Sequence, residues 1–145
     1  MIERLLVPVD GGALDERAFD VSIGLATQLH AAITGLIVEP FPSAPPPSGV
    51  ASGAAEAVNE ATLISHAHSV LARFEQRSRE AGVPFHGVAT QASHVSEAIL
   101  AAAQAHACDM IVMVTHGRGL LGELLWGSNT REVLARTKLP VLVLH

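Results

Sequence analysis

Apolar residues follow two alternating patterns along this chain. Short segments rich in branched apolar residues predict buried strands. These runs occupy residues 5–9, 32–38, 83–90, 109–114 and 139–144. Between them, apolar residues recur every three or four positions, which predicts amphipathic helices. The helical segments are residues 14–30, 54–81, 95–106 and 130–136.

Strands that alternate regularly with helices are typical of a parallel sheet covered by helices on both faces. We therefore predict a single domain over residues 1–145. Its expected fold class is α/β, a three-layer sandwich. Right-handed crossovers restrict the possible topologies. We expect a five-stranded sheet of order 3-2-1-4-5, with the first strand beside the fourth. Ligands of such sheets bind at this change of winding direction, outside the carboxyl ends of the strands.

Composition narrows the class of protein. Hydrophobic residues make up 49% of the chain and charged residues 16%, which is typical of a globular domain. The formal net charge of -5 argues against a general nucleic-acid-binding protein. Cys108 is the only cysteine, so no intramolecular disulfide is possible. No apolar run approaches the ~20 residues of a membrane span, and residues 1–4 do not resemble a signal peptide. We expect a cytoplasmic protein.

The segment from Thr115 to Thr130 carries the most chemistry. It is rich in glycine, follows a predicted strand and leads into a predicted helix. Glycine lets backbone approach a ligand, and a helix N-terminus offers free N–H groups to an anion, so the segment suggests a phosphate cradle. Residues 117–122 satisfy G-x-G-x-x-G but lie too late in the chain for a dinucleotide fingerprint. Residues 122–128 lack the lysine of a Walker-type loop, since Ser128 takes its place.

A different motif fits this segment. Gly117, nine further residues and then Gly127-Ser128 resemble the nucleotide loop of the universal stress protein (UspA-like) family, in its ATP-binding type. Residues 5–10 resemble the family's first strand and acidic turn, and residues 108–113 and 138–143 resemble its fourth and closing strands. The resemblance covers essentially the whole chain.

The resemblance implies an α/β sheet of the Rossmann-like or adenine nucleotide α-hydrolase-like type. It also implies an ATP-binding regulatory or stress-response protein, usually a homodimer. By position, Asp10 would contact ribose or adenosine, and Ile37 would meet adenine through its backbone. The phosphate path would be lined by Met113, Gly117, Gly127, Ser128 and Asn129. The whole expected nucleotide site comprises Pro8, Val9, Asp10, Ile37, Met113, Val114, His116, Gly117, Arg118, Gly119, Gly127, Ser128, Asn129 and Thr130. ATP would be the ligand, and Mg²⁺ arriving with it would need few protein ligands.

One position departs from the family pattern. Val114 stands where the family has its first loop glycine. A β-branched residue resists positive φ and adds bulk, so it would weaken binding if the backbone there must follow the nucleotide closely. If the backbone is extended instead, the side chain can point into the sheet and be tolerated. The sequence leaves both readings open.

Functions other than nucleotide binding have less support in the sequence. The histidines show no zinc-like spacing with cysteine or carboxylates, so no protein metal site is expected. No nucleophile–base–orienter set is apparent, so we do not expect an enzyme. The alternatives are a dimeric interaction module without a nucleotide, or a weak ATPase or autokinase. The apolar final strand would be a free sheet edge unless it paired with its own copy, and we expect the homodimer to form through it. We expect no nucleic-acid or membrane partner, and no regulatory protein partner is identified.

Overall fold

The structure is a computed structural model, and it describes residues 1–41, 52–115 and 128–144. His116, Gly117, Arg118, Gly119 and Gly127, which belong to the predicted phosphate cradle, lie outside these residues. Side chains are described for the same ranges except residues 52–61. None of the helices in the described ranges combines the length and hydropathy needed to cross a membrane.

Strands and helices alternate along the chain, as the sequence predicts. The strands are β1 (Arg4–Val9), β2 (Ala32–Glu39), β3 (Phe85–Gln91), β4 (Met110–Val114) and β5 (Val141–Leu144). The helices are α1 (Asp15–Leu29), α2 (Ser52–Glu80), α3 (Val95–Ala105) and α4 (Ser128–Arg136). The five strands form one parallel sheet of order β3-β2-β1-β4-β5. The predicted fold class and strand order are confirmed.

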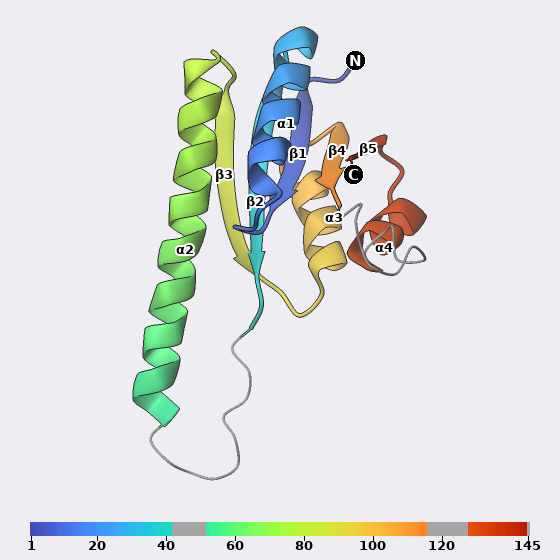
Figure 1. Cartoon of the computed structure of the whole chain (residues 1–145). Helices are drawn as coiled ribbons and strands as arrows, with labels where there is room; N and C mark the ends of the chain where they lie inside the picture. Colours follow the sequence, from blue (N-terminus) through green and yellow to red (C-terminus); the bar gives the residue numbers. More distant parts are fainter. Residues whose placement is uncertain (42–51, 116–127, 145) are drawn as a thin grey trace.

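Helices cover both faces of the sheet, α1 and α2 on one face and α3 and α4 on the other (Figure 1). Each helix buries one stripe of side chains at helical spacing; in α2 the stripe contains Ala67, Val70 and Phe74. Strand side chains alternate between the faces, so Leu5 and Val7 pack with α1 and α2 while Leu6 packs with α3 and α4. This double burial explains why β1, β2 and β4 are almost continuously apolar, whereas the outer strand β3 is only partly buried and carries more polar residues.

Two strands begin two residues later than their apolar runs. The runs start at residues 83 and 139, whereas β3 begins at Phe85 and β5 at Val141. Pro84 and Pro140 stand directly before these strands. They contribute only their carbonyl groups, which accept hydrogen bonds from Ile33 N at 2.8 Å and Ile111 N at 3.0 Å. Proline has no N–H to donate, so regular pairing begins one residue later.

Two long-range hydrogen bonds to one side chain connect β1 and β4 at the amino end of the sheet. Asp109, just before β4, accepts hydrogen bonds from Glu3 N at 2.8 Å and from Arg4 N at 3.0 Å. These bonds hold the start of β1 beside β4. The carboxyl ends of the two central strands consequently meet at the opposite edge of the sheet, where the chain changes its winding direction.

Candidate functional site

A pocket of about 410 Å³ lies at the carboxyl ends of β1 and β4. This is the change of winding direction at which ligands of doubly wound sheets bind. Contributions come from β1 and its turn, the ends of β2 and β4, and the first turns of three helices. The lining residues are Pro8, Val9, Asp10, Leu14, Asp15, Val38, Val95, Ile99, Met113, Val114, Thr115, Asn129 and Thr130.

The turn after β1 supplies the carboxylates of the pocket. Asp10 accepts a hydrogen bond from Gly12 N at 2.8 Å, which fixes its side chain at the pocket rim. Gly11 has φ +82°, a conformation that glycine adopts without a Cβ penalty. Asp15, the first residue of α1, is only 3% exposed and folds back to accept hydrogen bonds from Asp10 N and Gly11 N.

Burial raises the pKa of the Asp15 carboxyl above its usual value. Hydrogen bonds from the backbone of Asp10 and Gly11 act in the opposite direction, and the nearby charge of Asp10 raises the pKa further. The turn therefore holds one carboxylate buried against backbone donors and a second one accessible to a ligand.

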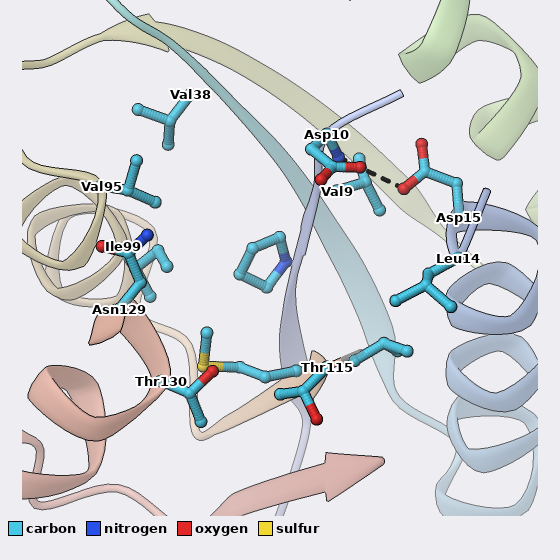
Figure 2. Close-up of a pocket in the computed structure, with 13 residues that line it drawn as sticks. Val9, Asp10, Leu14, Asp15, Val38, Val95, Ile99, Thr115, Asn129 and Thr130 are labelled. Atoms are coloured by element: carbon cyan, nitrogen blue, oxygen red, sulfur yellow. Dashed lines mark hydrogen bonds between the residues drawn. The ribbon is translucent and has the colours of Figure 1, made fainter. Parts of the chain in front are cut away.

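The opposite wall of the pocket is apolar. Figure 2 shows Val38, Val95 and Ile99 across the pocket from Asp10 and Asp15. Val38 comes from β2, and Val95 and Ile99 lie one turn apart on α3. A mainly apolar cavity with a few convergent polar groups is the usual composition of a small-molecule site.

The start of α4 forms a polar part of the wall. Asn129 is exposed and Thr130 is 4% exposed, and both line the pocket in the first turn of this helix. Helix N-termini carry free N–H groups and a partial positive charge, so this end of the pocket favours an anion. The position of α4 is supported by its contact with α3, where Ser96 donates a hydrogen bond to the Glu132 carboxylate.

Val114 is the last residue of β4 and is paired with Leu144 of β5. Its backbone is therefore extended, and its side chain packs in part against the core on the α1 and α2 face. Of the two readings of this position, the structure favours the one in which valine is tolerated. The next residue, Thr115, is tied to the end of β5 because its N–H donates to Leu144 O at 2.7 Å.

The structure brings much of the expected nucleotide site together. The expected residues that line the pocket are Pro8, Val9, Asp10, Met113, Val114, Asn129 and Thr130. Ser128 is exposed at the start of α4 and is not among the lining residues. Ile37 is 1% exposed, with its side chain in the core, and its neighbour Val38 lines the pocket instead. Contact of any of these residues with a ligand, including the backbone of Ile37, stays a prediction.

Sequence reasoning missed Leu14, Asp15, Val38, Val95, Ile99 and Thr115. Strand alternation offered one usable signal, because it puts Val38 on the opposite face from Ile37. Asp15 had a weaker signal, an acidic residue at the start of a helix that follows a glycine turn. Within the described ranges, no three His, Cys, Asp or Glu side chains are grouped closely enough to hold a metal ion.

Comparison with known proteins agrees with this architecture. The model of the family described as "Universal stress protein family" matches residues 1–145. A universal stress protein of Thermus aquaticus is 39% identical over 64 residues, and this match spans 44% of the chain and 47% of that relative. The chain thus aligns with about half the length of this curated relative.

Solved structures share the fold over nearly the whole chain. A universal stress protein from Burkholderia pseudomallei is 22% identical, with a TM-score of 0.79 over 99% of this chain and 96% of that chain. A universal stress protein in complex with cAMP is 21% identical, with a TM-score of 0.71 over 99% and 97%. One from Archaeoglobus fulgidus in complex with dAMP is 16% identical, with a TM-score of 0.65 over 100% of both chains. By the family match over its whole length, the chain belongs to the universal stress protein family.

Proposed function

We propose that the protein is a homodimeric regulator that binds an adenine nucleotide, ATP with its Mg²⁺ ion, in the pocket at the carboxyl ends of β1 and β4. The observation that carries the proposal is the meeting of the acidic turn after β1 with the first turn of α4 in one pocket. The Asp10 carboxylate is an acceptor suited to ribose hydroxyls. The start of α4 suits phosphate groups. The solved relatives with cAMP and dAMP support the adenine nucleotide class.

The apolar wall of the pocket suggests how the nucleotide would be oriented. The planar base would lie against Val38, Val95 and Ile99, where it can leave water without unpaired charge. The ribose would then face Asp10, and the phosphates would extend toward Asn129 and Thr130. ATP is proposed over AMP, ADP and cAMP because of the resemblance of the segment from Gly117 to Ser128 to the family's ATP loop.

Calorimetric titration of the wild-type protein with Mg-ATP tests this function. We expect a dissociation constant below the millimolar range, and Asp10→Asn should bind about tenfold more weakly because it loses a charged acceptor. Asp20→Asn is the matched control, since Asp20 lies on the surface of α1 and pairs with Arg77 of α2. No heat of binding for wild type at millimolar Mg-ATP would contradict the proposal. Parallel titrations with AMP, ADP and cAMP would identify the preferred nucleotide.

A catalytic role finds little support in the pocket. Among its described lining residues, Asp10 and Asp15 are the only titratable side chains, and both already accept backbone hydrogen bonds. Neither group is paired with a nucleophile there. We infer that the protein acts by binding, and that phosphate release from ATP should be no faster in wild type than in Asp10→Ala.

The homodimer proposal rests on β5. This strand stands at one end of the sheet order and is partly exposed along its length. An apolar edge strand of this kind invites pairing with a second copy. Sedimentation of the purified protein should give the mass of a dimer at micromolar concentration, and a monomer there would contradict this arrangement.

A further inference from the structure

The backbone of the turn between β1 and α1 donates hydrogen bonds to the Asp15 carboxylate. Asp10 N donates to Asp15 Oδ1 at 3.2 Å, and Gly11 N donates to Asp15 Oδ2 at 2.7 Å. Successive N–H groups beside a left-handed residue form a concavity that binds anions, and Gly11 is left-handed with φ +82°. Both carboxylate oxygens of Asp15 are used, and the side chain is 3% exposed. The Asp15 carboxylate therefore occupies the anion-binding concavity of this turn.

The same turn orients the ligand-facing carboxylate. The Asp10 side chain accepts from Gly12 N at 2.8 Å, while the backbone N–H of Asp15 donates to Gly12 O at 3.2 Å. Asp15 is thus bonded to each of the three turn residues, once to Asp10, once to Gly11 and once to Gly12. Figure 2 shows the bond between Asp10 and Asp15 at the rim of the pocket. Loss of the Asp15 acceptors would release the backbone from which the Asp10 side chain projects.

We propose that Asp15 is a positioning residue of the nucleotide site, which holds the turn from Asp10 to Gly12 so that the Asp10 carboxylate faces the ligand. This role rests on the proposed nucleotide binding. It also assigns the two N–H groups of the turn to Asp15, so they are not available to phosphates. Ligand phosphates are left with the start of α4 as the anion-favouring side of the pocket.

The role of Asp15 depends on its charge. Protonation would turn one oxygen into a hydroxyl donor that faces a backbone N–H donor, and one of the two turn bonds would be lost. Burial raises the pKa of Asp15, so this loss occurs at higher pH than for an exposed aspartate. Asp10 on the turn is the titratable group that acts on Asp15, and the His66 ring of α2 lies against the neighbouring Gly11. Glu16, the next residue of α1, is paired with Arg73 and Arg77 of α2.

Affinity measurements with the isosteric variant Asp15→Asn test the proposal. At neutral pH we expect Mg-ATP to bind Asp15→Asn about tenfold more weakly than wild type, since one charge-assisted acceptor of the turn is lost. Asp20→Asn removes a carboxylate from the same helix at an exposed ion pair and should change the affinity by no more than about twofold. Equal affinity of Asp15→Asn and wild type would overturn the positioning role and leave the proposed function intact. Absence of binding in wild type itself would overturn both.

The pH profile separates positioning from a general structural effect. The ratio of wild-type to Asp15→Asn affinity should fall toward one as the solution is acidified, because wild type then also loses the charged acceptor. Ionisation of the nucleotide cancels in this ratio, since both proteins bind the same ligand. A ratio that stays constant over the acidic range would contradict the proposal.

The amide proton of Gly11 in the ligand-free wild-type protein reports on the same contact, even if Asp15→Asn folds poorly. In wild type the amide proton of Gly11 should titrate with the Asp15 carboxyl, at higher pH than is usual for aspartate. In well-folded Asp15→Asn this titration should be absent. An amide of Gly11 that does not respond to acid in wild type would show that Asp15 does not hold the turn.

Discussion

Gly11→Ala should destabilise the turn after β1, on which the proposed site depends. Gly11 has φ +82°, and a Cβ added there would overlap the Nε2 atom of His66. The left-handed conformation costs a non-glycine residue about 1–2 kcal/mol. Alanine also restricts the unfolded chain more than glycine does, which offsets about 0.4–1 kcal/mol of this cost. Backbone conformation alone should therefore lower the free energy of unfolding by about 1 kcal/mol.

Gly82→Ala is the matched control for this backbone term. Gly82 ends α2 with φ +73°, and a Cβ there would meet no heavy atom within 4 Å. In Gly11→Ala the imidazole of His66 must also move. That ring is exposed and at the end of its side chain, so we assign the movement about 0.5–1.5 kcal/mol, the cost of an off-rotamer side chain. Gly11→Ala should be less stable than Gly82→Ala by this amount.

Urea unfolding followed by circular dichroism measures these differences. In a His66→Ala background the excess cost of Gly11→Ala over Gly82→Ala should vanish, because the ring that must move is gone. Gly11→Ala should also weaken Mg-ATP binding by shifting the N–H that donates to Asp15, whereas Gly82→Ala should leave affinity unchanged. Equal stability of Gly11→Ala and Gly82→Ala in the wild-type background would refute the contact with His66. Full stability of both would refute the left-handed conformations.

Three further predictions follow from burial and packing. Gly35→Ala should lower the free energy of unfolding by about 1–3 kcal/mol, measured by urea unfolding, because its Cβ would lie 2.6 and 2.8 Å from ring atoms of Phe85 in the core. Val114→Gly should lower the melting temperature by several degrees without a gain in ATP affinity, because the valine is extended and partly packed. A gain in ATP affinity over wild type would instead support the alternative in which the wild-type protein is a dimeric interaction module that binds no nucleotide. Burial raises the pKa of Asp15 above 3.8, so the folded state binds this proton more tightly than the unfolded state. The stability of wild type relative to Asp15→Asn should therefore increase as pH falls through the window between the raised pKa and 3.8, and no change there would contradict the assignment.

The sequence was most informative where a signal is local. Leu5 to Val9 followed by Asp10 and two glycines predicted a strand that ends in an acidic turn, and the structure confirms that strand and turn. The predicted helix over residues 54–81 ends within one residue of α2, where Gly82 is left-handed and stops a helix without a Cβ penalty. The strand boundaries at Pro84 and Pro140 were less accurate, since apolar side chains can be buried before regular hydrogen bonding begins.

By itself the sequence determined the order of strands and helices, the 3-2-1-4-5 sheet and the position of the Asp10 turn at the change of winding direction. These follow from side-chain periodicity and from the handedness of parallel crossovers, which act within neighbouring segments. Only the tertiary structure decided that Asp15 fills the turn, that Val38 faces the pocket with Val95 and Ile99, and that Val114 is extended. The last two depend on contacts between parts of the chain that become neighbours only on folding. The bonds of Asp15 to the turn are local in sequence, but the burial that desolvates its carboxylate comes from the tertiary structure.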